Sequence, residues 1–328
     1  MIYSKEIFSQ AENEINRRHV TSLAEFEKHQ NEIEVIAPEI ALINRQLINT
    51  SVRLSKAILK KNENIKSAVE KIKNENLKGQ EQIKVMLKDF GFPSDYLDLH
   101  FFCKECGDTG YVNGVRCECF NELLKTYAVS ELNKNSNIKL RCFEEFNLGF
   151  YPDYTDETTG INPKQKMLAN LNSCKEFVNK FSQNTTSIFM SGKTGLGKTF
   201  LSSAIANELL QKGYNVAFDS MQNFLRAIEN EHFGRSSEKD TLQILIDADL
   251  VILDDLGSEF NSSFYATTVY NIINTRLNKG VPTIISSNLS FGELQEKYGD
   301  RIVSRLSGMF WWMMFFGKDI RQLNTVNI

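Results

Sequence analysis

The segment FMSGKTGLGKTF, residues 189–200, contains the residue types that bind phosphate groups. From Gly192 to Thr199 it matches the P-loop pattern G-x-x-x-x-G-K-[ST]. In such a loop, glycines allow backbone N–H groups to surround phosphate oxygens, where side chains would collide. Lys198 is expected to contact the β- and γ-phosphates, and the Thr199 hydroxyl to bind Mg²⁺. The glycines of the expected ATP site are Gly192, Gly195 and Gly197.

Further polar residues follow two apolar segments. LVILDDLG, residues 250–257, has the Walker B arrangement, in which apolar residues precede two carboxylates. Asp254 is expected to hold Mg²⁺, and Asp255 to polarise the attacking water. Asn288 follows PTIISS and is expected to orient that water, although an Asn at this place is also common as a cap or turn residue. Adjacent buried carboxylates are costly without a cation, which supports the interpretation as an ATP site.

Four cysteines form two close pairs: Cys103, Cys106, Cys117 and Cys119. Thiolates at this spacing are typical of a structural zinc site with Zn–S distances of about 2.3 Å. The intervening GDTGYVNGVR has the glycines that the hairpin of a small zinc ribbon requires. An iron–sulfur cluster is an alternative, and His100 is a possible substitute ligand. Cys142 and Cys174 are expected to be ordinary buried thiols.

Composition places the chain among globular proteins of two domains and a connector. Its 328 residues are 41% hydrophobic and 24% charged. The net charge of −3 does not by itself indicate nucleic-acid binding. It does not exclude such binding either, because a local basic groove is enough to bind a nucleic acid. No apolar run reaches the roughly 18 residues of a membrane span. The N-terminus lacks the apolar core of a signal peptide. We therefore expect a cytoplasmic protein with no membrane partner, whose cysteines bind metal or stay reduced.

Residues 1–95 are expected to form a helical, partner-binding region. From residue 36 its apolar residues alternate spacings of four and three, which indicates a helix packed along another helix. These residues are Ile36, Ile40, Ile43, Leu47, Thr50, Leu54 and Ala57. Both a small bundle and a long intermolecular coiled coil have this pattern. The four-cysteine segment is expected at 96–135, followed by a linker at 136–164.

Residues 165–328 alternate helical and apolar segments, which predicts an α/β domain with a parallel sheet. The expected strands are Ser187–Ser191, Asn215–Asp219, Leu250–Asp254 and Pro282–Ser286. Their apolar composition is typical of strands buried on both faces. The apolar segment 309–316, MFWWMMFF, also suits a buried strand.

Two arginines, Arg301 and Arg305, lie four residues apart and so share one face of a predicted helix. Such a pair near a sheet edge can act in the nucleotide site of a neighbouring subunit. The alternative is that they form ion pairs with Glu296 or Asp300.

Five ordered motifs resemble the AAA+ module of DnaC/DnaI-type replicative helicase loaders, which the IstB transposition helpers share. They are GKTGLGKT, LDDLGSE, SSN, DRIVSRL and GKDIR. The resemblance covers about residues 140–325 and implies an AAA+ P-loop NTPase fold. It implies that Arg305 is the arginine finger, that Arg301 neighbours it at a subunit interface, and that Arg321 touches the γ-phosphate of its own site. Loaders of Gram-positive bacteria also resemble this chain in having a zinc site at the end of the N-terminal region.

Two features depart from the AAA+ pattern. Asp255 stands where Glu is common, as is usual in this group of loaders, and its shorter side chain predicts slow hydrolysis of ATP. Only seven residues follow Arg321, so we expect no full helical lid and a site completed by a neighbouring subunit.

A loader must also hold single-stranded DNA, for which basic and aromatic residues are suited. The candidates are Phe264, Tyr265, Arg276, Lys279, Arg226, Arg235 and Lys239.

The sequence therefore predicts an ATP- and Mg²⁺-dependent loader that places a DnaB-type ring helicase on single-stranded DNA in replication initiation or restart. ATP would act as a switch, the ATPase domains would self-associate, and by the resemblance the N-terminal region would bind the helicase. The alternative is an IstB-like helper that binds DNA and targets a transposase. Asp255, Asn288 and the paired arginines argue against a small-molecule kinase. The complete set of Lys198, Thr199 and Asp254 argues against a scaffold with a vestigial site.

Overall fold

The computed structural model describes residues 3–50, 65–134, 136, 138–157, 159–234 and 240–321. The chain divides into two units, one made of residues 1–10 and 121–328 and the other of residues 11–120. Leu54, Ala57, Arg235 and Lys239, which the sequence analysis singled out, lie outside the described residues. Within the described ranges, every helix is too short or too polar to cross a membrane.

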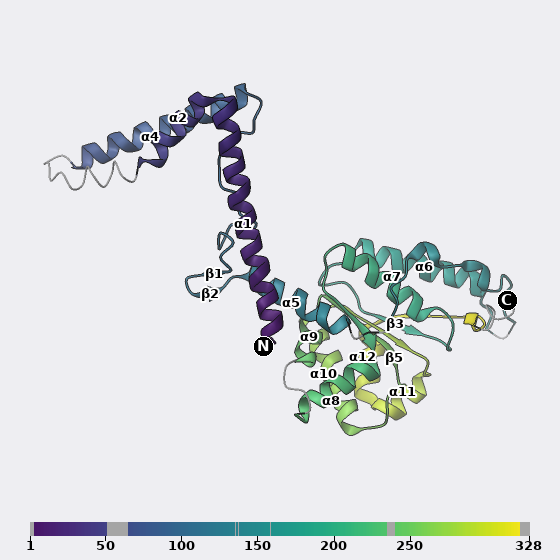
Figure 1. Cartoon of the computed structure of the whole chain (residues 1–328). Helices are drawn as coiled ribbons and strands as arrows, with labels where there is room; N and C mark the ends of the chain where they lie inside the picture. Colours follow the sequence, from purple (N-terminus) through teal and green to yellow (C-terminus); the bar gives the residue numbers. More distant parts are fainter. Residues whose placement is uncertain are drawn as a thin grey trace. The chain divides into compact units, whose positions relative to one another are not determined.

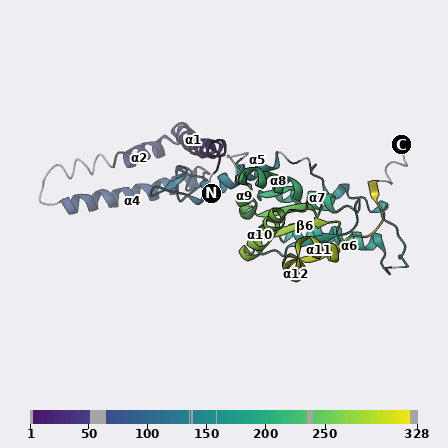
Figure 2. The same ribbon diagram turned by 90° about the horizontal axis from the view of Figure 1, so that it is seen from below.

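The helical part of the smaller unit contains α1 (Lys5–Ile36), α2 (Pro38–Ile48) and α4 (Ile65–Asp89). Pro38 opens α2, a position where proline's missing N–H costs nothing. In Figure 1 and Figure 2 alike, α2 and α4 lie side by side. Their shared core, which includes the end of α1, consists of Ile33, Ala37, Ile40, Ile83 and Leu87, with Ile43 and Leu47 packed against it.

The described part of the apolar stripe thus packs within the chain, as expected for a small bundle. Gly79 of α4 lies close to Leu47, since an added Cβ would come 3.1 Å from Leu47 Cδ2. Ile36 is 47% exposed and does not belong to the stripe. The break between α1 and α2 changes the direction of the helix axis directly after this residue, so its place in the repeat is lost.

The cysteine-rich segment contains the expected hairpin. Strands β1 (Tyr111–Val112) and β2 (Val115–Arg116) pair antiparallel. The two residues between them, Asn113 and Gly114, have φ of 52° and 79°. Positive φ at both positions of a two-residue loop is the requirement of a type I′ hairpin turn, which Asn-Gly meets at low cost. Helix α5 (Glu118–Asn133) follows.

The larger unit is built on a parallel sheet with the order β4-β5-β6-β3-β7. The strands are β3 (Ile188–Ser191), β4 (Val216–Ser220), β5 (Leu250–Leu256), β6 (Thr283–Ser287) and β7 (Trp311–Met314). The order confirms the predicted α/β class and places β6 between the two strands that carry the P-loop and Walker B residues. The prediction for the last strand was wrong in one respect. Because β7 is at the edge, Trp311 stays 44% exposed rather than buried.

Helices cover both faces of this sheet, as Figure 1 shows. Helices α6 (Pro163–Asn179) and α7 (Lys198–Gln211) lie on one face. The other face carries α8 (Met221–His232), α9 (Thr241–Asp247), α10 (Ser263–Lys279), α11 (Phe291–Tyr298) and α12 (Asp300–Met309). Two short 3₁₀ turns, Phe143–Glu145 and Leu148–Phe150, lie in the segment expected to be a linker. Phe143, Phe146 and Tyr151 from this segment pack into the core beneath α6 and α7.

Arg276, which was expected to contact DNA, lies in the core instead. It is 0% exposed. Its guanidinium donates hydrogen bonds of 2.6–2.9 Å to Thr283 Oγ1 and to the backbone carbonyls of Leu245, Ala248 and Pro282. Burial lowers the pKa of Arg276 to about 9. The side chain therefore joins the ends of α9 and α10 to the start of β6 and is not available to DNA.

We expect Arg276→Met to lower the free energy of unfolding of this unit by about 3 kcal/mol or more, because several buried carbonyls would lose their donor. Both tryptophans, Trp311 and Trp312, belong to β7. Urea denaturation followed by tryptophan fluorescence therefore reports on the sheet. Arg226→Met on the exposed face of α8 is the control and should change stability by less than about 0.5 kcal/mol. Equal effects of the two changes would contradict this role of Arg276.

Candidate nucleotide and metal sites

The P-loop lies between β3 and α7, and its glycines have the backbone conformations that the motif requires. Gly195 and Gly197 have φ of 76° and 92°, in the left-handed region that disfavours side chains. At Gly192 an added Cβ would come 2.7 Å from the Phe315 carbonyl oxygen. At Gly195 it would collide with the carboxylate of Asp319. The turn is thus closely surrounded by the segment that follows β7.

Lys198, the first residue of α7, points back into this turn. It is 6% exposed. Its Nζ donates to the carbonyl oxygens of Gly192 and Lys193 at 2.6 and 2.9 Å, and to Asn288 Oδ1 at 2.6 Å. Burial lowers the pKa of Lys198 to about 8. The ammonium therefore lies between the P-loop and the end of β6, where the positive end of α7 also attracts anions.

Asp254, at the end of β5, is held by two hydroxyl groups. Thr199 Oγ1 donates to Asp254 Oδ2 at 2.8 Å, and Ser286 Oγ donates to Oδ1 at 2.6 Å. Burial raises the pKa of Asp254, and the two hydroxyl donors act in the opposite direction. The fold thus brings together the two residues that the sequence proposed as Mg²⁺ ligands. A carboxylate and a hydroxyl oxygen are hard donors of the kind that Mg²⁺ prefers.

Asp255 turns away from Asp254 and towards Asn288. Its φ is 58°, and the pairing of β5 with β6 shifts register between Leu253 and Leu256. Its N–H donates to Ser286 Oγ at 2.9 Å, and Asn288 Nδ2 donates to Asp255 Oδ1 at 2.5 Å. Asn288 therefore joins Lys198 to Asp255.

Ser286 was not identified from the sequence. It is 1% exposed and contacts both carboxylate residues of the Walker B segment. The sequence signals were its place in the SSN motif and in a buried strand, two residues before Asn288, which puts it on the same face of the sheet as Asn288.

Arg321 lies beside the P-loop of its own chain. The N–H of the preceding residue, Ile320, donates to the Gly195 carbonyl at 3.0 Å. After burial, which is the main cause, the charge of Arg321 further lowers the pKa of Lys198. The charge of Arg321 thus acts on Lys198 of its own chain, and its contact with the γ-phosphate stays a prediction.

The arginines of α12 are placed differently. The Arg305 guanidinium lies 4.8 Å from the centroid of the Tyr270 ring, and Arg301 is exposed. In the part of the chain that the structure describes, neither forms an ion pair with Glu296 or Asp300. Since α12 lies on the opposite face of the sheet from α7, these arginines do not join the P-loop residues of the same chain.

The cysteine cluster has the dimensions of a tetrahedral thiolate site. The four sulfur atoms, from Cys103, Cys106, Cys117 and Cys119, lie within 4.8 Å of one another. The distance from Cys103 to Cys117 is 3.7 Å and that from Cys106 to Cys119 is 3.5 Å. Zn–S bonds of about 2.3 Å place tetrahedral sulfurs about 3.8 Å apart, so the donor set fits zinc. Backbone N–H groups lower the pKa of Cys103 to about 7, whereas burial raises the pKa of Cys119.

His100 does not belong to this cluster. It is exposed, and its Nε2 contacts the backbone oxygen of Asp95 at 3.0 Å. Of the two remaining cysteines, Cys174 is buried, and burial raises its pKa to about 12. The expectation of burial was wrong for Cys142, which is exposed because it precedes the first 3₁₀ turn at the surface of α7.

The predicted DNA contacts separate into buried and exposed residues. Tyr265 is 6% exposed and donates to Glu229 at 2.8 Å, so it belongs to the core. Phe264 packs beside His232 and Phe233, with ring centroids 5.1 and 5.8 Å away. Phe233 is 59% exposed. We call Phe264, His232 and Phe233 the aromatic cluster. Lys279 pairs with Asp247, and Arg226 is exposed on α8.

The match to a known family lies within the larger unit. The profile of a family described as IstB-like ATP binding protein matches residues 130–306. The replicative helicase loader DnaC of Escherichia coli K12 is 29% identical over 147 residues, which are 44% of this chain and 60% of that protein. The replicative helicase loader DnaI of Bacillus subtilis 168 is 32% identical over 112 residues, 34% of this chain and 36% of DnaI. The matches thus span less than two thirds of either relative. A crystal structure of the DnaC helicase loader overlaps 53% of this chain with a TM-score of 0.45 and 22% identity.

We expect Ser286→Ala to weaken the Mg²⁺-dependent binding of ATP about tenfold, because a hydrogen bond to a charged group contributes about 1.5–3 kcal/mol. Loss of the donor would also raise the pKa of Asp254 further, so the defect should be larger at pH 6 than at pH 8. Titration of Mg²⁺ with a fluorescent ATP analogue measures both effects.

Ser287→Ala is the matched control. Ser287 is equally buried, but its Oγ donates to the Leu256 carbonyl at 2.6 Å rather than to a carboxylate. Its Mg²⁺ dependence should match that of the wild type. A Ser286→Ala protein with normal Mg²⁺ dependence would show that Ser286 does not position Asp254.

Proposed function

Because this chain belongs to the family of IstB-like ATP binding proteins, we propose that it is an ATP-dependent loader of a ring-shaped replicative helicase. The observation that carries this proposal is the hydrogen-bonded set that joins Lys198, Asn288, Asp255, Asp254 and Thr199 at one edge of the sheet. A group of this kind suits ATP with Mg²⁺. The helicase as partner rests on the similarity to proteins named replicative helicase loaders.

In the proposed site, each residue has a distinct role. Lys198 neutralises the β- and γ-phosphates, and Thr199 and Asp254 would hold Mg²⁺, which would supply positive charge to the phosphate oxygens. Asp255 polarises the attacking water, and Asn288 orients that water. The short Asp255 side chain, already bound by Asn288, supports slow hydrolysis, so that ATP acts mainly as a switch between two states.

Arg301 and Arg305 act in the site of the next subunit. Their position on the face opposite α7 supports this role, because within one chain they lie apart from Lys198. Stacking on Tyr270 and a hydrogen bond of 2.8 Å to Asn274 hold the Arg305 side chain against α10. Arg321, beside its own P-loop, supplies charge to the γ-phosphate in the same subunit. Assembly of several subunits would therefore stimulate hydrolysis.

Single-stranded DNA is the proposed nucleic-acid ligand, and the aromatic cluster is its candidate contact. Exposed rings that lie together can stack on bases without regard to sequence. Phe233 offers an exposed ring with the half-buried Phe264 beside it, and Arg226 supplies a charge on the exposed side of the same helix that carries His232.

The N-terminal helical region is the proposed contact for the helicase. Helices α2 and α4 expose large apolar side chains, including Leu42 at 60%, Leu77 at 54% and Val85 at 52%. Exposed apolar residues on packed helices are common where another protein binds. The four-cysteine segment is proposed to bind zinc and to stabilise this region, which has only a small core.

A loading assay tests the proposal. The full-length protein, a DnaB-type helicase from the same cell and circular single-stranded DNA are mixed with ATP, and DNA-bound helicase is measured. Loading should require the wild-type protein and fail with Lys198→Ala. Arg305→Ala should bind ATP normally yet lose the stimulation of hydrolysis that assembly causes. Loading that does not depend on the protein, together with specific binding of a transposase, would favour the IstB-like helper instead.

We expect Phe264→Ala to weaken binding to oligothymidine about tenfold, since stacking of one base on an aromatic ring contributes about 1–3 kcal/mol. Fluorescence anisotropy with a labelled oligonucleotide measures the affinity. Phe291→Ala on α11 is the control, since it removes an aromatic side chain that is 47% exposed and lies outside the aromatic cluster. Unchanged affinity in Phe264→Ala would remove the aromatic cluster from the DNA path.

A further inference from the structure

The loop that carries the first two cysteines has a special backbone. Gly107, Asp108 and Gly110 all have positive φ, at 58°, 55° and 78°. Such a conformation is uncommon for a residue with a side chain, so Asp108 requires compensating contacts. Asp108 is 2% exposed, which means that its carboxylate must also be paired inside the protein.

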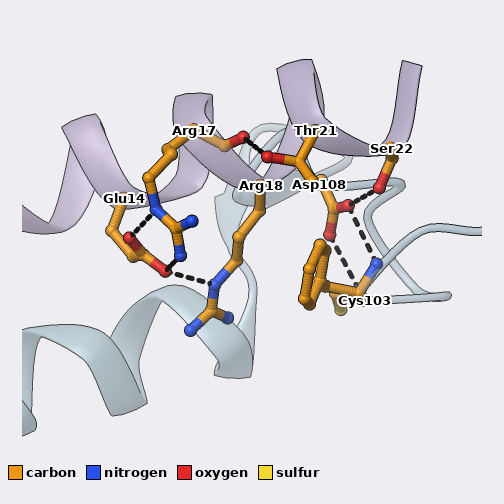
Figure 3. A network of polar contacts seen from close by, with 8 residues as sticks. Glu14, Arg17, Arg18, Thr21, Ser22, Cys103 and Asp108 are labelled. Carbon is orange, nitrogen blue, oxygen red and sulfur yellow. Dashed lines mark hydrogen bonds and ion pairs between the residues drawn. The ribbon is translucent and has the colours of Figure 1, made fainter. Parts of the chain in front are cut away.

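The Asp108 carboxylate is bound from two sides. Its Oδ1 accepts the N–H of Cys103 at 2.7 Å, and its Oδ2 accepts the N–H of Phe102 at 2.9 Å. The Ser22 hydroxyl of α1 donates to the same Oδ2 at 3.2 Å. Figure 3 shows the carboxylate between α1 and the backbone of Cys103. One side chain therefore fixes the backbone of a metal-ligand residue and contacts the long helix.

One face of α1 follows this loop. Ile15, Arg18, His19 and Ser22 are spaced by three and four residues, as neighbours on a helix surface are. His19 Nδ1 lies 3.3 Å from the Gly107 carbonyl oxygen.

Arg18 contacts the residue next to the first cysteine. Its guanidinium lies 5.8 Å from the centroid of the Phe102 ring. Glu14 accepts a hydrogen bond from Arg18 Nε at 2.9 Å, which is also drawn in Figure 3. Except for the contact between Glu14 and Arg18, all of these interactions depend on where the loop places residues 102–110.

A second attachment of α1 does not involve the cysteine loop. The Tyr96 hydroxyl donates to Glu32 at 2.6 Å, and its ring stacks on His29 with a centroid distance of 3.9 Å. Beyond it, Ile33 of α1 is buried in the apolar core shared with α2 and α4. This end of α1 is held by contacts that need no metal.

We propose that Asp108 is a positioning residue of the four-cysteine metal site, and that metal bound there holds residues 15–22 of α1 on the cysteine loop. The metal fixes the four sulfurs and thereby the loop between them. The fixed loop presents Asp108 to Ser22 and the Gly107 carbonyl to His19. Without the metal, these contacts lose their support, while the attachment around Tyr96 remains. The inference rests on the zinc site proposed above and is independent of ATP and of the helicase.

Hydrogen–deuterium exchange of the full-length protein, with zinc and after its removal by a chelator, tests this coupling. Exchange should increase in residues 15–22 and 101–119 when zinc is removed. Residues 29–40 and 83–87 should keep their protection. Unchanged protection of residues 15–22 would overturn the proposal. An equal increase along the whole of α1 would also overturn it, because the metal would then stabilise the entire unit rather than one attachment.

Three variants separate positioning from simple stability. Asp108→Asn should lower zinc affinity about 10–100-fold in competition with a colorimetric chelator, the usual effect of losing a group that orients a metal ligand. Ser22→Ala should bind zinc within about threefold of the wild type but lose protection at residues 15–22. Tyr96→Phe, the matched control, should change neither measurement.

Normal zinc affinity in Asp108→Asn would show that the carboxylate only stabilises the turn. A wild-type protein that holds no stoichiometric zinc would overturn both the metal site and this inference. Neither result would bear on the proposed ATP site.

Discussion

Asp254 is a carboxylate with 7% exposure at the end of a central strand, and a charge in such a place needs partners. Strands β3, β5 and β6 are parallel, so their carboxyl ends meet at one edge of the sheet. That edge supplies Ser286 directly and Thr199 through the start of α7. Asp255, Asn288 and Lys198 are joined to this carboxylate through Ser286 by a series of hydrogen bonds.

The second Walker B carboxylate shows how the fold avoids burying two like charges together. A register shift and the left-handed conformation of Asp255 turn its side chain away from Asp254, and Asp255 is only partly buried. The loop beyond it is then tied to α11, since Lys297 Nζ donates to the carbonyls of Gly257 and Glu259 at 2.7 and 2.6 Å. Helix α12 with its two arginines begins directly after α11. The same strand end is thus linked to the P-loop on one face and to the arginine helix on the other.

The smaller unit has a small apolar core and therefore needs other interactions for its stability. The described core around Ile40 holds the C-terminal end of α1 through Ile33. The cysteine loop holds α1 farther towards its N-terminus, through Ser22. A unit with so little buried apolar surface gains most from a metal that fixes a loop. Both units therefore depend on a buried carboxylate, Asp254 or Asp108, whose oxygens are shared between segments far apart in the chain.

Chemistry carried by neighbouring residues was predictable from the sequence. The P-loop, the Walker B segment, the paired cysteines and the glycine-rich hairpin between them are short, and their residues act together because they are adjacent. Burial on both faces likewise leaves a continuous apolar segment, so the strands of the parallel sheet were located from composition alone.

The tertiary structure decided what depends on contacts between distant segments. Ser286 and Asp108 are an ordinary serine and aspartate until a neighbouring strand or helix is placed beside them. Arg276 is basic and so was taken for a DNA contact, but three backbone carbonyls from the end of α9 and the start of β6 surround it. Segment 309–316 is apolar enough for a central strand, yet its position at the sheet edge leaves Trp311 exposed. Residue type sets which interactions a side chain can make, and only the fold sets which partners reach it.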